Sequence, residues 1–440
     1  MVNTKNDFMK RMSLIVMIML FGHMMASAQE EEQEYAVDVH GQLSVSGTHI
    51  VDKNGEPVQL QGMSLFWSNW STPGGIEGNF YTYEAVEETR DYWCANIVRA
   101  AMGIEPDGAY LDNPEAQKAK VETIIEAAID LGIYVIIDWH DHTAHEHEEE
   151  AAAFFVEMAQ KYGDYPNIIY EIYNEPDYRC EIDPGNDPCP SDERSYYDWG
   201  TNIKPYSEVV IDSIRKYDEN NIIVCGTPRW SQDVDVASEN PIDGENIAYT
   251  LHYYAGSHKQ WLRDRAITAM ENGVALFVTE YGTVDASGDG DVDEEESQLW
   301  FDFMEEHKIS HCNWSLHDKD EGASALKPGT SNQGGWTDED LTASGLFVRD
   351  YLVENCPEYH TIPEPPTTST ASKEEDFTQI YPNPFSSKLF IEGVEGQWQL
   401  YNISGLLIKE GDEQVINTSQ LEKGIYILSV GHKTYKVVKE

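Results

Sequence analysis

Two glutamates, Glu175 and Glu280, end apolar runs in the segments IIYEIYNEPD and ALFVTEYG. Burial at the end of a strand raises the pKa of a carboxyl group. Glu175 is therefore predicted to keep its proton near neutral pH and to serve as a general acid. An ionised Glu280 across the same mouth is predicted to be the nucleophile. If the two carboxyl groups lie about 5 Å apart, such a pair cleaves a glycosidic bond with retention, through a covalent glycosyl-enzyme.

Further residues near strand ends are expected to support this pair. Arg99 is predicted to donate to Glu280 and to keep it ionised. Asn174 is a candidate to hydrogen-bond the 2-OH of a sugar. The remaining members of this predicted ring are His140, His252, Tyr254 and Trp314, the last as a floor under the sugar at the cleavage point.

A repeating scaffold must position these residues. Short apolar strands are predicted at 58–64, 96–102, 133–139, 168–173, 222–226, 247–252, 275–280 and 310–315. Helical patterns are predicted at 115–131, 151–162, 199–217, 259–272, 297–308 and 341–354. This alternation predicts an α/β fold, a (β/α)8 TIM barrel. Catalytic groups in such a barrel lie at the C-terminal ends of the strands, which is where the polar residues above fall.

The composition limits the partners of the chain. It has 29 Lys and Arg against 79 Asp and Glu, a net charge of −50. Such a surface repels nucleic acid and anionic lipid and suits a neutral substrate. No cofactor and no metal are predicted, and the protein is expected to be a monomer.

Both ends of the chain differ in composition from the barrel. Residues 1–28 are predicted to be a signal peptide, since a basic start precedes an apolar run at 14–25 and the small residues Ala26-Ser27-Ala28. That run is shorter than the roughly 20 residues of a membrane span. Residues 29–36 are predicted to be an acidic leader and 37–358 the barrel. Residues 359–376, rich in Pro, Thr and Ser, are a predicted linker. Residues 377–440 are a predicted small β-sandwich.

Cysteines and acidic segments suggest further sites. Cys180 and Cys189 flank a short polar loop and are candidates for a disulfide, whereas Cys225 and Cys312 are expected to be buried thiols. The four histidines of HDHTAHEHEEE, which begins at His140, could be taken for a zinc cluster, but they lack a fixed zinc spacing. The segment 285–296, DASGDGDVDEEE, fits a calcium-loop template. A calcium loop of this type follows a helix, however, whereas a predicted strand precedes this segment.

Residues 37–358 resemble glycoside hydrolase family 5, specifically its bacterial endoglucanases. The matching segments are GEPVQLQGMS, ANIVRAAM, GIYVIIDWHDH, YPNIIYEIYNEP, VCGTPRWSQDVD, IAYTLHYYAGSH, LFVTEYG and HCNWSLHDKDEGASALKPG. The resemblance implies that Glu175 is the acid/base and Glu280 the nucleophile. It implies support by Arg99, His140, Asn174, His252, Tyr254 and Trp314. It also implies substrate contacts by Trp67, Trp230, Lys319 and Glu321.

Two departures from the family pattern stand out. The segment GMSLFWSNW lacks a histidine that some members carry there, and the insertion between Cys180 and Cys189 follows the acid/base strand. The insertion is expected to reshape the acceptor side of the site.

The tail resembles the C-terminal sorting domain of the type IX secretion system of Bacteroidetes. The resemblance rests on YPNPFSSKLFIEG, LYNISGLLIKEG and KGIYILSVGHKTYKVVKE. It implies export across the outer membrane, removal of the tail, and release or surface attachment. A carbohydrate-binding module is the competing interpretation, but Trp398 is the only tryptophan of the tail and lies within a predicted strand.

The two resemblances together imply a secreted endo-β-1,4-glucanase that hydrolyses internal bonds with retention. A β-1,4-mannanase or xylanase using the same two glutamates is an alternative, because loop shape sets the substrate in this family. A non-catalytic surface glycan-binding protein is a second alternative, and the intact pair of glutamates argues against it.

Overall fold

The computed structural model describes residues 34–71, 78–105, 107–180, 194–363, 379–381, 388–392, 398–402, 407–411, 414–421, 423–430 and 433–439. The chain divides into two compact units, residues 1–363 and 364–440. The predicted signal peptide, most of the leader and most of the linker lie outside the described residues. Within the described part, no helix has the length and apolar character needed to cross a membrane.

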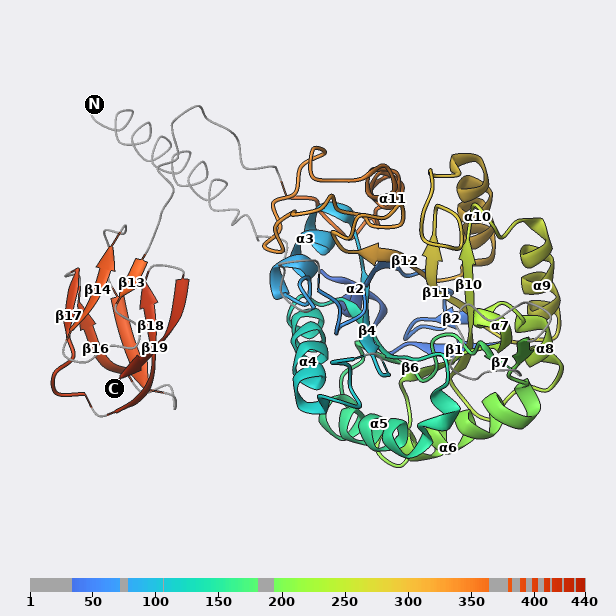
Figure 1. The fold of residues 1–440 in the computed structure, drawn as a ribbon, viewed down its shortest axis with the longest axis horizontal. Coiled ribbons are helices and arrows are strands. Elements are labelled where there is room, and N and C mark those ends of the chain that lie inside the picture. Colours follow the sequence, from blue (N-terminus) through green and yellow to red (C-terminus); the bar gives the residue numbers. More distant parts are fainter. Residues whose placement is uncertain are drawn as a thin grey trace, which may run out of the picture. The chain divides into compact units, whose positions relative to one another are not determined.

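The first unit is a closed barrel of eight parallel strands (Figure 1). In order around the barrel they are β3 (Gln61–Leu65), β4 (Ile97–Gly103), β5 (Tyr134–His140), β6 (Ile168–Glu171), β9 (Ile222–Cys225), β10 (Ile247–Tyr254), β11 (Leu276–Gly282) and β12 (His311–Leu316). Each overlaps one of the predicted strands. The predicted (β/α)8 barrel is therefore confirmed.

Helices surround the barrel on its outer face (Figure 1). The main ones are α3 (Tyr83–Trp93), α4 (Pro114–Asp130), α5 (Glu148–Tyr162), α6 (Lys204–Ile214), α8 (Val234–Glu239), α9 (Gln260–Glu271), α10 (Glu294–His307) and α11 (Ala343–Glu354). Helix α3 was not among the predicted helices. Its start has a capping signal, because the Thr82 side chain accepts a hydrogen bond from the Ala85 backbone N–H at 3.2 Å.

The lower lumen of the barrel, at the N-terminal ends of the strands, is apolar. Side chains from successive strands fill it, among them Ile97, Ile136, Ile169 and Phe277. Helix α2 (Ala36–His40) and the hairpin of β1 (Ser44–Ser46) and β2 (His49–Val51) add Ala36 and Ile50 to the same cluster. The predicted site residues lie toward the other end of the lumen, where the C-terminal ends of the strands meet.

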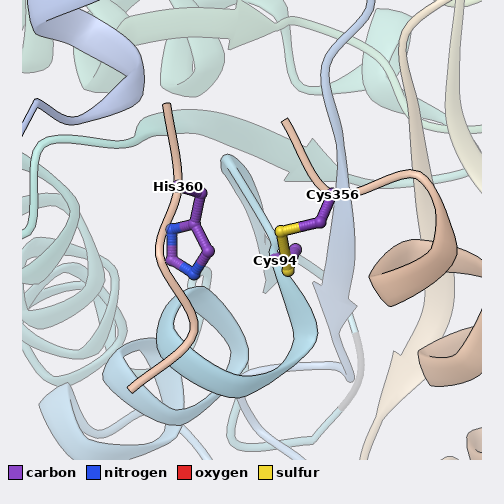
Figure 2. A group of neighbouring side chains, drawn as sticks. All are labelled: Cys94, Cys356 and His360. Atoms are coloured by element: carbon purple, nitrogen blue, oxygen red, sulfur yellow. A yellow bond between two sulfur atoms is a disulfide. The ribbon is translucent and has the colours of Figure 1, made fainter. Parts of the chain in front are cut away.

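A disulfide between Cys94 and Cys356 fastens the end of this unit to its lower side (Figure 2). Cys94 caps the C-terminus of α3 with φ of 56°, and Cys356 follows α11. Beyond it, the Tyr359 ring lies edge-on against His40, and its hydroxyl accepts a hydrogen bond from Asn96 Nδ2 at 3.2 Å. The barrel thus continues into the first residues of the predicted linker.

The first described residues of the barrel unit also differ slightly from the prediction. Ala36 lies in the stretch predicted as an acidic leader, yet it is buried and begins α2. The Val37 backbone N–H donates to the Gly132 carbonyl at 3.0 Å, which ties α2 to the segment before β5. Ala36 is small and apolar, and it packs into the cluster that fills the lower lumen.

The second unit is a small β-sandwich, as predicted. One sheet has the order β13 (Gln379–Tyr381), β14 (Lys388–Glu392), β17 (Val415–Asn417), and the other has the order β16 (Leu407–Gly411), β15 (Trp398–Asn402), β18 (Gly424–Val430), β19 (Lys433–Lys439). Leu389, Ile391, Leu400 and Leu428 share its core with Trp398. Trp398 is therefore a core residue of the sandwich and not an exposed sugar-binding ring.

Candidate active site

A buried charged layer lies directly above the apolar lower lumen. Its centre is Arg99 of β4, which is fully buried. The Arg99 guanidinium binds Glu171 at 2.7 Å through Nε and Asp138 at 2.9 Å through Nη2. Alternate residues of a strand share a face, so Arg99 points into the same lumen as Ile97. Neutralising this arginine requires carboxylates from several strands, which explains why β5 and β6 each carry one.

Glu280, at the end of β11, is gripped by two donors. Arg99 Nη1 donates to Glu280 Oε2 at 3.0 Å, and the Tyr254 hydroxyl donates to Glu280 Oε1 at 2.9 Å. The contact from Tyr254 depends on Gly282, because a Cβ at that position would stand 2.3 Å from Tyr254 Cδ1. The predicted contact between Arg99 and Glu280 is present, and both oxygens of Glu280 are fixed.

Glu175 follows β6 and lies against a histidine. His252 Nδ1 is 2.9 Å from Glu175 Oε1, and His252 Nε2 is 2.8 Å from Thr279 Oγ1. The Thr279 hydroxyl in turn donates to Glu171 Oε1 at 2.6 Å. A chain of hydrogen bonds thus joins Glu175 through the ring of His252 to the charged layer.

The carboxyl groups of Glu175 and Glu280 face each other across the mouth. One oxygen of each and a ring nitrogen of His252 all lie within 4.8 Å of one another. The fold thus brings together two glutamates that are 105 residues apart in the chain. This separation matches the about 5 Å of a retaining pair and is shorter than the roughly 6.5–9.5 Å of an inverting pair.

The electrostatics of the two glutamates differ from the sequence-based prediction. Burial raises the pKa of Glu175, but the hydrogen bond and charge of His252 outweigh it, and the net direction is downward. Burial and the neighbouring charge of Glu175 raise the pKa of Glu280 in spite of Arg99 and Tyr254. The prediction of a raised pKa for Glu175 is therefore wrong for the unliganded site. The physical reason is the position of His252, whose own pKa is raised to about 9.

Trp314, which is predicted to be the floor under the sugar, lies beside the His140 ring. The two rings are parallel with centroids 5.2 Å apart. His140 Nδ1 is hydrogen-bonded to Asp138 Oδ2 at 2.7 Å, and burial holds the pKa of His140 well below its usual range. The Trp67 ring lies edge-on to His140 at 4.2 Å. These contacts fix the orientation of the floor.

The side-chain amide of Asn174 has its oxygen engaged and its nitrogen available. Its Oδ1 accepts from Arg99 Nη2 at 2.7 Å. Its Nδ2 is buried and has no hydrogen-bond partner within the described parts of the chain. A buried donor without a partner lowers the stability of the folded protein. An oxygen atom of a ligand in the mouth could accept a hydrogen bond from this nitrogen and relieve that cost.

The family description Cellulase (glycosyl hydrolase family 5) matches residues 51–320, which is more than half of the chain. The chain belongs to glycosyl hydrolase family 5. An endoglucanase from Clostridium saccharobutylicum is 45% identical over 348 residues, covering 78% of this chain and 72% of that protein. Endoglucanase Z from Dickeya dadantii is 46% identical over 313 residues, covering 70% of this chain and 66% of that protein. The protein is an enzyme, a glycoside hydrolase whose relatives are endoglucanases.

Solved structures agree with this membership in family 5. A structure from Cytophaga hutchinsonii is 50% identical with a TM-score of 0.67, covering 73% of this chain and 98% of that one. The catalytic domain of a Thermobifida fusca endoglucanase is 32% identical with a TM-score of 0.65, covering 73% of this chain and all of that domain. Each match covers 73% of this chain and nearly all of the matched structure.

The tail of this family 5 enzyme has a match of its own. Residues 379–440 match a secretion system C-terminal sorting domain. The predicted type IX sorting domain is confirmed. The enzyme is therefore secreted.

Beyond Glu175, an antiparallel pair of strands packs aromatic side chains against Trp230. The pair consists of β7 (Tyr178–Cys180) and β8 (Arg194–Tyr196). The Trp230 ring meets Tyr178 and Tyr196 edge-on at 5.6 and 5.5 Å, and its backbone N–H donates to the Pro176 carbonyl at 2.8 Å. Cys180 is disulfide-bonded, and Cys189 lies outside the described residues.

Lys319 and Glu321, each of which is predicted to contact substrate, form a salt bridge with one another. Lys319 Nζ lies 5.3 Å from the ring centres of both Phe66 and Trp70. Trp70 is 41% exposed and was missed by the sequence analysis, which chose Trp67 from the same segment. The spacing of the segment could not decide between them, because the chain leaves the strand at Leu65 and alternation no longer applies.

Asp138 and Glu171 were also missed, although the sequence contained a signal for Asp138. Asp138 precedes His140 by two residues, and Glu171 precedes Glu175 by four. Alternation along β5 places Asp138 on the same face as His140, whereas Glu175 lies beyond Glu171, the last residue of β6. Two buried carboxylates require a buried cation, and Arg99 is the candidate.

The histidine and acidic segments do not gather into the patterns considered in the sequence. His145 Nδ1 lies 2.9 Å from the Tyr173 hydroxyl, and His147 Nδ1 lies 2.9 Å from Asp141 Oδ2. In the segment 285–296, Asp293 caps α10 and binds Lys259, while Glu296 binds Arg263 at 2.6 Å. Both of these calcium-template carboxylates are thus engaged by cations. Cys225 and Cys312 are buried free thiols, as predicted.

Three groups of side chains have potential metal-ligating atoms close together in the described parts of the chain. They are Cys94, Cys356 and His360; Glu105, Asp141 and His147; and Glu175, His252 and Glu280. The first has both sulfurs in the disulfide (Figure 2). In the second, the Asp141 oxygens already accept from His147, Thr143 and Trp139. The third is the glutamate pair itself, so each group is accounted for by protein contacts.

Proposed function

We propose that the enzyme is an endo-β-1,4-glucanase that hydrolyses internal glucosidic bonds with retention of configuration. The observation that carries the proposal is the pair of carboxyl oxygens of Glu175 and Glu280 within 4.8 Å of one another. The endoglucanase relatives support the choice of a β-1,4-glucan.

In the first step, the ionised Glu280 attacks the anomeric carbon while the bond to the leaving oxygen breaks. Glu175 gives its proton to that oxygen, and the sugar remains attached to Glu280 as an ester. Asn174 Nδ2 donates to the 2-OH of the attached sugar, and Trp314 supports the ring from below. In the second step, Glu175 removes a proton from water, which attacks the same carbon and frees Glu280.

The reaction needs one proton shared by the two carboxyl groups. In the free enzyme, His252 lowers the pKa of Glu175 against the effect of burial, whereas burial and the charge of Glu175 raise the pKa of Glu280. Catalysis uses a second form, in which Glu175 holds the proton and Glu280 is ionised. Positive charge developing at the anomeric carbon favours an ionised Glu280 and therefore this second form. Once the ester forms, Glu280 carries no charge, and the pKa of Glu175 falls as its role as a base requires.

A substrate panel with product analysis tests the proposal. The purified enzyme is incubated with barley β-glucan, carboxymethylcellulose, glucomannan and xylan, and products are sized over time. We expect rapid shortening of the β-1,4-glucans, with short soluble products appearing later. Hydrolysis of mannan or xylan alone would overturn the glucanase assignment. NMR of the first product is expected to show the β-anomer, and a first product of α-configuration would overturn the covalent step.

A further inference from the structure

Trp261 is an exposed aromatic residue outside the mouth. It lies in the first turn of α9 and is 43% exposed. Tyr165 is equally exposed at 43%, but it lies between α5 and the start of β6, at the lower end of the barrel. Helix α9, in contrast, follows the C-terminal end of β10, the strand that bears His252 and Tyr254. Trp261 therefore lies on the rim that surrounds the catalytic mouth.

The Trp261 ring is held in a defined orientation. The His258 ring meets it edge-on at 5.7 Å, and the Arg265 guanidinium lies 5.6 Å from its centre. The next residue along the helix, Leu262, is buried and anchors this turn. Arg265 forms salt bridges with Asp233 and Asp235, so its charge is compensated. The result is a fixed, exposed indole with no net positive charge beside it.

Contacts connect Trp261 to both sides of the catalytic machinery. On the side of the nucleophile, the Tyr254 hydroxyl donates to Glu280, and the Tyr254 backbone N–H donates to His258 Nδ1 at 2.8 Å. His258 is the residue whose ring meets Trp261. From the side of Glu175, Asp233 binds both Arg265 and Arg229, the neighbour of Trp230. Trp230 and Trp261 are thus linked along the rim that follows β9 and β10. Because the Trp230 backbone N–H binds the carbonyl of Pro176, the residue after Glu175, this part of the rim adjoins the group proposed to protonate the leaving oxygen.

We infer that Trp261 is a distal platform for the leaving-group side of a β-1,4-glucan chain. The inference rests on the proposed function and extends it to chains longer than the mouth itself holds. The flat faces of β-linked glucose units expose C–H groups that pack on an indole ring. A neutral polysaccharide also suits a surface with a net charge of −50 and a compensated arginine beneath the ring. The platform selects for chain length.

The test compares Trp261→Ala with the matched control Tyr165→Ala, each in the full secreted chain. Binding is measured by calorimetry in a Glu280→Gln background, with barley β-glucan and with cellotetraose. We expect Trp261→Ala to weaken binding of the long glucan about three- to tenfold and to weaken cellotetraose binding less. Trp261→Phe is expected to restore most of the affinity, and Tyr165→Ala to match the parent.

The outcomes separate this inference from the proposed function. Equal affinities of Trp261→Ala and Tyr165→Ala for the long glucan would overturn the platform, and so would equal losses for the long glucan and cellotetraose. Failure of the unsubstituted enzyme to cleave any β-1,4-glucan would instead overturn the proposed function. Melting curves of each variant show that a loss of binding is not a loss of folding.

Discussion

Ile97 and Arg99 are two residues apart on β4 and face the same lumen, yet they belong to different environments. Ile97 joins an apolar cluster closed by α2 and the first hairpin. Arg99 joins a charged layer with Asp138, Glu171 and Glu280. Burial of apolar surface stabilises the lower lumen. The upper lumen contains opposite charges that must be paired, because a buried charge without its partner destabilises the fold. Stability and catalysis are thus separated along one strand.

The strongest way to sharpen this comparison is Glu280→Gln. We expect kcat to fall about 10⁴-fold or more, because the amide cannot form the ester. The variant is expected to be at least as stable as the parent, since burial and Glu175 raise the pKa of Glu280 and disfavour its charge. Rate assays and urea unfolding at pH 7 measure both. A variant with more than a tenth of the parent activity would refute the assignment of the nucleophile.

Arg99→Met should affect both activity and stability. Removing this cation leaves buried carboxylates unpaired, which costs about 3–5 kcal/mol of unfolding free energy. Activity is expected to fall about 10³-fold, because Glu280 and Asn174 lose their shared donor. Ile97→Val on the same strand is the control and should cost about 1 kcal/mol with kcat/KM unchanged. If Ile97→Val impaired kcat as severely as Arg99→Met, the separation of the two layers would be wrong.

The disulfide tests the lower end alone. Replacing Cys94 and Cys356 by serine is expected to lower the unfolding free energy by about 2–5 kcal/mol, because the reduced unfolded chain gains conformational freedom. The value of kcat/KM should stay within twofold of the parent at about 25 °C, since neither cysteine contacts the mouth. Thermal melts with and without reductant check the first part. A large change in kcat at a temperature where the variant is folded would contradict the separation.

His252 provides a pH-dependent test of the upper end. Its pKa is raised from 6.5 to about 9 in the folded protein. Its protonated ring therefore contributes fully to stability below pH 6.5, and the contribution is lost as the pH rises through about 9. The loss is roughly 3 kcal/mol. In His252→Gln this alkaline decline should largely disappear, as followed by melting temperature from pH 6 to 10. An unchanged decline would show that another group is responsible.

The sequence predicted the scaffold more completely than the details of the site. Each of the eight strands was located, because apolar runs bounded by polar strand ends are local signals. The two glutamates were located for the same reason, and the structure brings them together. The direction of their pKa shifts was not predictable, since it depends on which glutamate His252 contacts. That choice is made by the packing of β10 against β11, far along the chain from Glu175.

Long-range pairings were the other limit. Cys94 and Cys356 are separated by 262 residues, and neither lies in a segment that marks it as paired. The sequence suggested only the nearby pair Cys180 and Cys189. Trp261 was likewise overlooked, because a tryptophan in an amphipathic helix is usually a core residue. Its exposure follows from the position of α9 on the rim, which only the closed barrel defines.

The disulfide has a topological consequence for an enzyme that works outside the cell. Because it joins positions 94 and 356, it turns the intervening chain into a covalent ring. A protease that cuts one peptide bond anywhere inside this ring opens it but releases no fragment. The two carboxyl groups of the mouth, at 175 and 280, both lie inside the ring. A nicked molecule therefore keeps them on one covalently connected body.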